Sequence, residues 1–472
     1  MSALPSLSDS STAMPEPGQT LPRWKAGEIL EITITDLSST GDGLGRWDER
    51  VIFVPDTVPG DRVQLRLNHV KPRYGYGNLL ELLSPGPARV RPACIVADKC
   101  GGCQWQTVGY DLQIAAKHEQ VKSALERIGK FQQVPLDSII PAPQALGYRN
   151  KVSYPLAFHK GQVQAGYYRK GSHRIVNLNQ CPVQDVRLNP LLAGVKLDIQ
   201  DQAWSIYNEL DHTGALRHLG LRIGRRTGEI LLTLVTASDD LPELSEQAAV
   251  WMATYPGLVG VCLNYNSQPG NQIFGPETEL ITGQASIWEQ FAGLEFVINA
   301  TSFFQVNTEQ AEVLVEMIKR ELNLSQTETI LDAFCGVGTL SLPLATQARA
   351  VVGVEISPAT VAQAQINAQI NQITNAEFIV GDMATWIPAA DLHPDIILLD
   401  PPRKGCDPQT LACLETLAAP RIVYVSCNPA TLARDLDQLC HQGAYELTKT
   451  QPLDFFPQTA HVETVAFLRR RN

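Results

Sequence analysis

Hydrophobic and polar positions follow three different periods along the chain. From about residue 22 to residue 84, apolar and polar residues alternate one by one, as in GEILEITITDL, and Gly, Pro and Asp residues separate the short runs. A period of two is typical of strands that bury one face. Several such strands in succession predict a small all-β, OB-like barrel over residues 22–84.

Residues 85–300 predict an α+β middle domain. PGPARVRP reads as a linker, and DLQIAAKHEQVKSALERIGK, further on, has a helical period. From Tyr148 to about Asn299, strand-like runs such as EILLTLVTA and GLVGVCLNY dominate, with one helix expected near Leu244–Thr254. Strands and helices that do not alternate regularly are typical of α+β domains.

In residues 301–472, helix and strand patterns alternate regularly. A helical run, TEQAEVLVEMIKREL, precedes the strand ETILDAF, and strands AVVGVEI, AEFIVGD, DIILLD and RIVYVSC follow with helical segments between most of them. This alternation predicts an α/β, Rossmann-like domain with a doubly wound parallel sheet. The last two runs, AYELTKTQPLD and HVETVAFLRR, predict a hairpin-like pair that places an antiparallel strand at or near the sheet edge.

Composition narrows the class of protein. The 472 residues suffice for about three domains, and 44% hydrophobic residues allow sizeable cores. No run of 18 apolar residues occurs, which excludes a transmembrane helix, and residues 1–21 predict a flexible tail without a secretory signal. Ten cysteines in such a chain indicate reduced thiols and therefore a cytoplasmic protein, with no membrane and no obligatory protein partner implied.

Charge is distributed unevenly. The formal net charge is −11, but residues 62–174 hold 17 Lys or Arg against 6 Asp or Glu. This asymmetry suggests a basic binding face joined to an acidic remainder, although clustering by chance on a solvated surface would give the same count. Lys71, Arg73, Tyr74 and Tyr76 lie near one expected turn, and cations beside aromatic rings suit RNA contact, whereas tyrosines in a small barrel are as often core.

Candidate chemistry lies at the carboxyl ends of the expected parallel strands, where doubly wound sheets bind ligands. The glycine-rich turn DAFCGVGT allows a ligand to approach the backbone closely. Glu355, about 20 residues later, can accept both hydroxyls of a ribose, and Asp382 can accept an adenine amine. The combination favours an adenosine-containing cofactor. Two prolines follow Asp400 and fix the backbone there, which favours a role for its carboxylate in polar recognition at the cleft floor. The alternative is a simple turn that ends the strand.

The cysteines divide into three groups by position. Cys427 follows the apolar strand RIVYV at the start of a helix, a place that lowers a thiol pKa and suits a nucleophile, against the alternative of a buried structural thiol. We expect core positions for Cys262, Cys413 and Cys440, while Cys335 and Cys406 lie in cleft loops and stay ambiguous. Four further thiols suit a cubic iron–sulfur cluster or a zinc ion. They are Cys94, Cys100, Cys103 and Cys181.

The pairing of LDPPR with VSCNP resembles the S-adenosylmethionine-dependent RNA (uracil-C5)-methyltransferases, and FFQVN, DAFCGVGT, GVE and HVET extend the resemblance to nearly the whole chain. The start of the chain resembles a TRAM domain. The closest subgroup is that of the bacterial enzymes that methylate 23S ribosomal RNA, some of which carry a [4Fe–4S] cluster. The resemblance therefore implies RNA as substrate, a TRAM barrel at 22–84, a middle domain at 85–300 and a catalytic domain at 301–472.

By residue, the resemblance implies cofactor contacts from Gln305, Phe334, Glu355 and Asp400, with Asp382 beside the adenine. It also implies that Cys427 is the nucleophile, that Glu463 is the general base, and that the four cysteines hold [4Fe–4S]. Thr339 and Asp382 stand where some relatives have Asn, which puts those two contacts in doubt. The chemistry is consistent, because a thiolate that adds to uracil C6 makes C5 nucleophilic and a base must then remove the C5 proton.

Three alternatives remain open from the sequence. Transfer RNA would be an alternative substrate for the same chemistry. An exocyclic-amine methyltransferase would use Asp400 and the two prolines, but normally has an aromatic residue where this chain has Arg403. A non-catalytic RNA-binding protein would not need Glu355, Asp400, Cys427 and Glu463 together.

Overall fold

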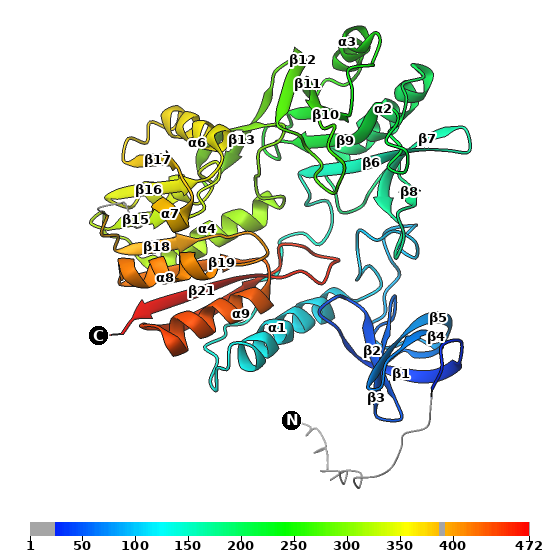
Figure 1. The fold of residues 1–472 in the computed structure, drawn as a ribbon, viewed down its shortest axis with the longest axis horizontal. Coiled ribbons are helices and arrows are strands. Elements are labelled where there is room, and N and C mark those ends of the chain that lie inside the picture. Colours follow the sequence, from blue (N-terminus) through cyan, green and yellow to red (C-terminus); the bar gives the residue numbers. More distant parts are fainter. Residues whose placement is uncertain (1–23, 387–391, 472) are drawn as a thin grey trace, which may run out of the picture. The chain divides into compact units, whose positions relative to one another are not determined.

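The computed structural model describes residues 24–386 and 392–471. The tail expected at residues 1–21 lies outside the described residues. The chain forms two compact units: one extends to Pro87 without residues 39–41, and the other comprises residues 39–41 and 88 onward (Figure 1). Among the described residues, no helix is both long and apolar enough to cross a membrane.

The first unit is the expected small barrel. Its strands close in the order β1-β2-β3-β5-β4 around a core of Ile, Val and Leu side chains from alternate positions. The outward Tyr74 and Tyr76 are 40% and 39% exposed, with ring centroids 6.0 Å apart, so these two aromatic residues are not core. The five strands are β1 (Ile29–Leu37), β2 (Gly43–Trp47), β3 (Arg50–Val54), β4 (Arg62–Val70) and β5 (Tyr74–Ser84).

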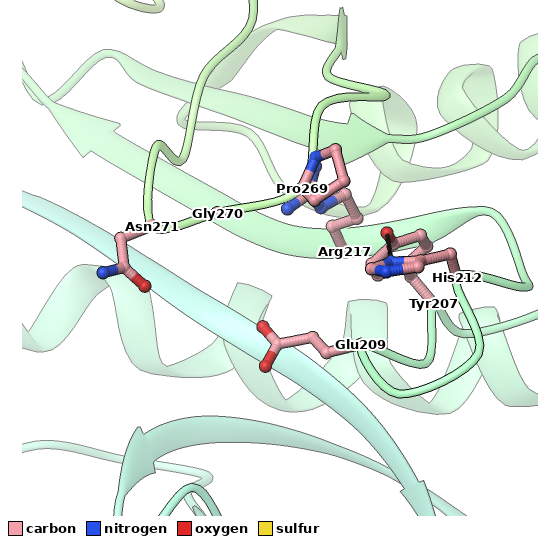
Figure 2. A pocket seen from close by; sticks show the side chains of 7 residues that line it. All are labelled: Tyr207, Glu209, His212, Arg217, Pro269, Gly270 and Asn271. Atoms are coloured by element: carbon pink, nitrogen blue, oxygen red, sulfur yellow. Dashed lines mark hydrogen bonds between the residues drawn. The ribbon is translucent and has the colours of Figure 1, made fainter.

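The second unit contains a mixed middle sheet in the order β12-β11-β10-β9-β6-β7-β8. Two helices, α2 and α3, share one apolar cluster with this sheet, and a polar pocket lies among the loops that flank β9 and β11 (Figure 2). The helix expected near residues 244–254 is α3. The strands are β6 (Lys151–His159), β7 (Gln162–Tyr168), β8 (Ile175–Asn177), β9 (Leu216–Ile223), β10 (Ile230–Thr236), β11 (Leu258–Tyr265) and β12 (Glu277–Gly283), and the helices are η1 (Val186–Leu188), α2 (Asn189–Asp201) and α3 (Leu244–Thr254).

The sequence did not predict α2, and its packing explains part of the reason. Gly194 lies inside this helix, where glycine weakens helix propensity. A Cβ atom at Gly194 would lie only 1.8 Å from the Tyr255 hydroxyl, so the close approach of the two side-by-side segments requires glycine there. The contact with Tyr255 therefore explains why this position is glycine, although glycine taken locally argues against a helix.

The C-terminal sheet has the order β17-β16-β15-β18-β19-β21-β20. Strands β15 to β19 are parallel, whereas β21 runs antiparallel to both β19 and β20, which confirms the expected terminal pair at the edge. The strands are β15 (Thr329–Asp332), β16 (Ala350–Glu355), β17 (Ala376–Val380), β18 (Ile396–Leu399), β19 (Arg421–Ser426), β20 (Tyr445–Leu453) and β21 (Glu463–Arg470). A separate two-stranded sheet consists of β13 (Ser286–Phe291) and β14 (Leu294–Asn299).

Helices cover both faces of this sheet, as a parallel sheet requires. Along β18, Ile396 and Leu398 join the apolar cluster under α4 to α6, while Ile397 and Leu399 join the one under α1, α8 and α9. Helix α1, expected in the middle domain, thus lies on the C-terminal sheet beside α9 (Figure 1). The helices are α1 (Tyr110–Arg127), α4 (Thr308–Leu322), α5 (Ser341–Ala345), α6 (Pro358–Ile370), α7 (Met383–Trp386), α8 (Pro408–Leu417), α9 (Pro429–Asp437) and a π-helical turn, η3 (Gln438–Gln442).

The expected domain boundary at residue 300 stays a prediction, because the middle and C-terminal sheets belong to one compact unit.

Candidate active site

The carboxyl ends of β15, β16, β17 and β18 meet along one edge of the C-terminal sheet. The order of strands reverses between β15 and β18, since the chain moves outward from β15 to β17 and then returns to β18 on the other side. Open α/β sheets bind ligands at such a switch point. A cavity of about 440 Å³ lies there.

Four of the expected cofactor-contact residues line this cavity. They are Phe334, Glu355, Asp382 and Asp400. Gln305 is buried and does not appear among the lining residues, whereas Phe303 of the same segment does line the cavity and is 64% exposed.

The turn after β15 leaves its backbone open to a ligand. Gly336 and Gly338 have φ values of 55° and 86°, a conformation that L side chains rarely adopt. Gly336 lines the cavity, and a Cβ atom added there would meet nothing within 4 Å. Hydrogen bonds from Ala333 and Cys335 to the neighbouring strands fix the turn, at 2.9 Å to Leu398 O and 3.1 Å to Val354 O.

Three carboxyl groups near this edge, of which Asp332 and Glu463 are buried and Asp400 is partly buried, have raised pKa values. Burial, despite hydrogen bonds from Ser341 and the Phe334 amide, raises the pKa of Asp332 to about 6. Burial followed by the neighbouring Asp332 raises the pKa of Asp400. Burial followed by Asp400 raises the pKa of Glu463 well above its usual range, and Arg403 opposes that rise. Asp400 and Glu463 therefore hold protons more readily than ordinary carboxyl groups do.

The half-buried Cys427 lies beside the same carboxyl groups. Burial, then Glu463, raises the pKa of the Cys427 thiol to about 11, with a further contribution from Asp400 and an opposing one from Arg403. The direction is opposite to the one expected from its place at a helix start, so that expectation is wrong.

Local geometry explains why the helix does not lower this pKa. Cys427 precedes the N-cap of α9, Asn428, whose side chain accepts the Ala430 N–H at 3.1 Å. Pro429, the first helical residue, has no N–H to offer. The N-terminus of α9 therefore stabilises the Cys427 thiolate little, and burial beside two carboxyl groups determines the direction of the pKa shift.

Arg403 and His461 complete the site, and the sequence analysis assigned neither a role. Arg403 Nη2 and His461 Nδ1 are 2.7 Å apart, and the Arg403 side chain also hydrogen-bonds to Cys427. Burial, then Arg403, lowers the pKa of His461 to about 4, so its ring is neutral near pH 7 and can accept a hydrogen bond from the guanidinium. Both residues belong to motifs of the sequence, since Arg403 ends DPPR and His461 begins HVET. They are 58 positions apart, however, so the sequence gave no reason to pair them.

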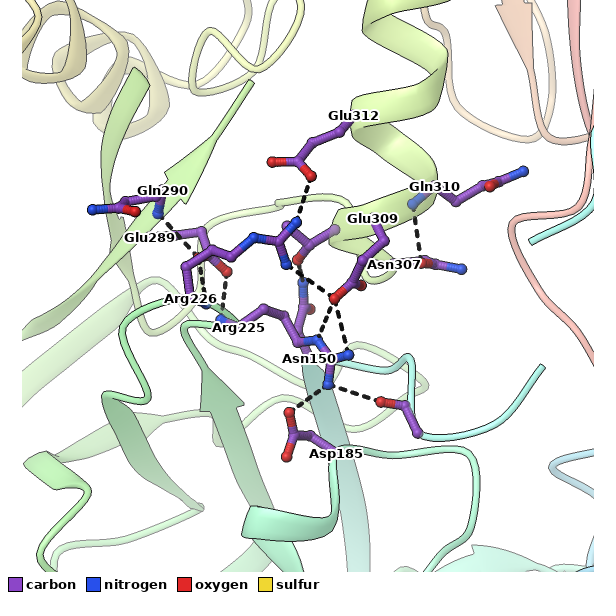
Figure 3. A network of polar contacts seen from close by, with 12 residues as sticks. Asn150, Asp185, Arg225, Arg226, Glu289, Gln290, Asn307, Glu309, Gln310 and Glu312 are labelled. Atoms are coloured by element: carbon purple, nitrogen blue, oxygen red, sulfur yellow. Dashed lines mark hydrogen bonds and ion pairs between the residues drawn. The ribbon is translucent and has the colours of Figure 1, made fainter. Parts of the chain in front are cut away.

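A polar network fixes the backbone of the FFQVN segment from the middle domain (Figure 3). Asn150 Nδ2 donates to Gln305 O at 2.8 Å and to Thr308 Oγ1 at 2.9 Å. Arg225 pairs with Glu309 on α4 at 2.9 Å and with Asp185. The network therefore ties the start of α4 to the middle sheet.

The four candidate metal cysteines line one small pocket together with Arg149 and Tyr167. Burial raises the pKa of Cys103 to about 12, and it also raises the pKa values of Cys100 and Cys181. Over residues 24–386 and 392–471, no three His, Cys, Asp or Glu residues are placed to hold a metal ion. The chain thus gathers the four thiols without showing the expected metal-cluster loop.

The remaining cysteines are buried. Cys262, Cys413 and Cys440 are core residues, as expected. Of the two ambiguous thiols, Cys335 packs in the core under the glycine turn, and Cys406 lines the cavity at β15 to β18. Burial raises the pKa of Cys406 to about 12.

Two family matches cover separate parts of the chain. Residues 23–80 match the TRAM domain, and residues 324–456 match a methyltransferase domain. The chain is 58% identical to an uncharacterized RNA methyltransferase of Nostoc sp. over 94% of its length and 97% of that protein. It is 39% identical to an uncharacterized RNA methyltransferase of Halalkalibacterium halodurans over 94% of its length and 98% of that protein.

A solved structure extends the likeness to three dimensions. The crystal structure of the Pyrococcus abyssi tRNA (uracil-54, C5)-methyltransferase in complex with S-adenosyl-L-homocysteine has a TM-score of 0.76 to this chain. It is 29% identical, and the match covers 93% of this chain and 99% of that one.

Proposed function

The chain belongs to the family of S-adenosylmethionine-dependent RNA methyltransferases with a TRAM domain, and from that premise we propose that it methylates C5 of a uridine through a covalent cysteine adduct. One observation carries the proposal. Ser426 at the end of β19 pairs with Thr464 of β21, so Cys427 and Glu463 lie at the ends of neighbouring strands, and the charge of Asp400, which lines the cavity, raises the pKa values of both. The proposed nucleophile, the proposed base and the proposed cofactor cavity are thus neighbours.

In this proposal S-adenosylmethionine, bound among Phe334, Glu355, Asp382 and Asp400, supplies an electrophilic methyl group. The Cys427 sulfur, after losing its proton, bonds to C6 of the uracil, and the C5–C6 double bond shifts toward an enolate. C5 would then bond to the methyl group as the sulfur–methyl bond of the cofactor breaks, which leaves S-adenosylhomocysteine. Glu463 removes the C5 proton, and the C6–S bond breaks to restore the thiolate and the double bond.

The raised pKa values give each carboxyl group a distinct role. A Glu463 carboxylate in a buried site is a stronger base than an exposed one, which suits removal of a carbon-bound proton. Asp400, when protonated, can donate a hydrogen bond to the pyrimidine edge as well as face the cofactor. Arg403, a cation that lowers the Cys427 pKa, would stabilise the thiolate.

The target base must leave its stack to reach Cys427 between these groups. The site lies at the end of a sheet rather than on an exposed ridge, so we propose a loop or flipped uridine as substrate.

The decisive test is tritium release from RNA that carries tritium at uridine C5. We expect release with wild type and none with Cys427→Ala, while Cys440→Ala, which removes a core thiol away from the site, should retain release. Methyl transfer without tritium release would instead indicate an exocyclic amine as acceptor. No transfer to any RNA would indicate a non-catalytic RNA-binding protein.

Glu463→Gln tests the base. The methyl group is still transferred, but the C5 proton stays, so the RNA–protein adduct should accumulate as a band that resists denaturant. Glu377→Gln, which removes an exposed carboxylate from β17, is the matched control and should show only the wild-type amount of RNA–protein adduct. If the Glu463 variant turns over without trapping, Glu463 is not the base.

We propose 23S ribosomal RNA as the substrate, as the subgroup resemblance suggests, and transfer RNA as the second candidate. The Pyrococcus abyssi relative named above acts on tRNA by its name, which favours that second candidate. Mapping 5-methyluridine by mass spectrometry in both RNA classes from a deletion strain distinguishes them, because only the true substrate loses the modification.

We further propose that Cys94, Cys100, Cys103 and Cys181 hold a [4Fe–4S] cluster. Four thiols lining one pocket form a donor set that suits such a cluster, and burial, together with the neighbouring thiols, raises the pKa values of Cys100 and Cys181. Anaerobically purified protein should contain about four irons and four sulfides per chain. One zinc per chain and no iron would replace the cluster with a structural zinc site.

A further inference from the structure

A polar pocket in the middle domain shares no lining residue with the cavity at β15 to β18 or with the cysteine pocket. It is lined by Tyr207, Glu209 and His212 from the loop before β9, by Arg217 on β9, and by Pro269 to Asn271 after β11 (Figure 2). None of these residues lines the cavity at β15 to β18. Nothing in the proposed methyl transfer uses them.

Arg217 makes one wall of the pocket rigid. Its side chain is 4% exposed, and Nη1 donates to the carbonyl oxygens of Asn266 and Gln268 at 2.6 and 2.7 Å. Its guanidinium carbon lies 4.7 Å from the Tyr207 ring centroid, and the Tyr207 hydroxyl lies 2.7 Å from His212 Nδ1. The wall thus combines a buried cation with an aromatic ring whose orientation is fixed.

The opposite side of the pocket offers acceptors. Glu209 is an exposed carboxylate, reached by the Tyr168 hydroxyl, and Asn271 can donate and accept. A ligand that fits must therefore donate to a carboxylate, accept from a guanidinium or amide, and tolerate a ring beside it.

The volume limits the size of that ligand. The cavity measures about 180 Å³. Pockets that enclose drug-sized ligands measure roughly 300–1,000 Å³, whereas an engineered cavity of about 150 Å³ binds benzene. The pocket therefore has room for a single planar ring system that projects from a longer chain.

The surroundings favour RNA as that chain. Arg169, His173 and Arg174 are exposed on the β7–β8 connection, directly after Tyr168, and can meet phosphates. Leu210, between the pocket residues Glu209 and His212, is 94% exposed, which suits a contact with a base or sugar. A cationic surface with an apolar tip beside a small polar pocket is typical of single-strand recognition.

We propose that this pocket binds one unpaired guanine of the RNA substrate. Guanine alone among the RNA bases carries two adjacent donors, N1–H and the 2-amino group, which a carboxylate such as Glu209 can accept together. Its O6 and N7 accept from arginine. The inference rests on the chain acting on RNA and is independent of which atom is methylated.

Binding of labelled single strands tests the proposal without any methyl transfer. The probes are fluorescein-labelled nine-residue uridine oligomers with a central guanosine, inosine, adenosine or uridine, followed by anisotropy. Inosine lacks only the 2-amino group. We expect wild type to bind the guanosine strand about tenfold more tightly than the inosine strand, the factor that one hydrogen bond to a charged group supplies.

Glu209→Gln should reduce that guanosine preference to about twofold or less, because a neutral amide oxygen accepts more weakly. Glu246→Gln, which removes an exposed carboxylate from α3 in the same domain, should leave the tenfold preference intact. Equal binding of the guanosine and inosine strands by wild type, or an undiminished preference in Glu209→Gln, would overturn the proposal.

A photo-crosslink locates the base directly. A strand with 6-thioguanosine at the centre should crosslink to a peptide that contains residues 207–212 or 269–271. Crosslinks found only elsewhere would show that guanine binds at another place and would overturn the assignment. Since neither measurement involves turnover, failure of the uracil-C5 proposal in the tritium assay leaves both outcomes unaffected.

Discussion

The reactivity of Cys427 can be predicted quantitatively from its surroundings. Its pKa is raised to about 11 by burial and by Glu463. At pH 8, roughly one thiol in a thousand is then ionised, against roughly one in four for an ordinary cysteine of pKa about 8.5. Because the thiolate is the reactive form, alkylation in the RNA-free protein should be roughly 200-fold slower than that of an ordinary thiol at pH 8.

The assay is alkylation by iodoacetamide over a pH series, with the Cys427 peptide quantified by mass spectrometry. The rate should rise about tenfold per pH unit from pH 7 to pH 10, without a plateau. Two variants should shift the curve in opposite directions. Glu463→Gln removes a carboxyl group that raises the pKa, so the curve moves to lower pH, whereas Arg403→Met removes the opposing cation, so it moves to higher pH.

Glu377→Gln on the surface of β17 should leave the curve in place. A plateau at or below pH 9 in wild type would refute the reasoning, as it would mean that the helix start controls the thiol after all. Shifts of the same sign in the Glu463 and Arg403 variants would refute the assignment of the two side chains as opposing influences.

Three further predictions concern stability and RNA binding. Asp400→Asn should raise the melting temperature at pH 8 and lose that advantage near pH 4. Folding raises the pKa of Asp400, so its ionised form destabilises the fold once the pH exceeds the usual aspartate pKa of about 4. An equal advantage at both pH values would contradict this. Lys117→Met should lower the free energy of unfolding in denaturant by about 3–5 kcal/mol, because it leaves the fully buried Asp454, 2.5 Å from Lys117 Nζ, without its cationic partner. Adding Asp454→Leu should recover most of this loss. No recovery in the double variant would show that the ion pair is not the cause. Neutralising Lys71 and Arg73 beside the exposed tyrosines should flatten the salt dependence of RNA binding by roughly one unit per lost phosphate contact in filter binding at several salt concentrations, and an unchanged slope would place the contacts elsewhere.

The regular parts of the fold could be predicted from sequence because local and tertiary preferences agree there. Helix α4 begins and ends as the pattern indicates, with Asn307 accepting the Gln310 N–H at 3.2 Å and Asn323 in the left-handed conformation at its end. The buried parallel strands read as apolar runs with a carboxylate at the end, so Asp332, Glu355 and Asp400 could be placed on one sheet edge.

Features that depend on distant contacts could not be predicted. The sequence favoured a lowered Cys427 pKa, because the helix start is visible locally while the burial and the neighbouring Glu463 are not. Arg403 and His461 meet only through the folded sheet. The position of α1 on the catalytic sheet depends on its packing beside α9, about 300 residues later, and no local pattern encodes such a partner.

The cysteine pocket and the proposed base are linked by one short segment of chain. Two residues after Cys103, the Trp105 backbone N–H donates to Gln458 O at 3.0 Å. Gln113 on α1 bonds to the same two residues: its Nε2 donates to Trp105 O at 3.1 Å, and its Oε1 accepts the Gln458 N–H at 2.9 Å.

Tyr148, packed with Cys103 and Cys181, donates its hydroxyl proton to Pro457 O at 3.1 Å. The segment that these bonds hold runs directly into Glu463 at the start of β21, whereas the cofactor cavity is built on β15 to β18 and shares none of them. A change that loosens the cysteine loop should therefore displace the base before it disturbs the cofactor. Cys103→Ser is expected to slow release of the C5 proton while S-adenosylmethionine affinity stays near that of wild type, and an equal loss of both would mean that the segment does not carry the effect.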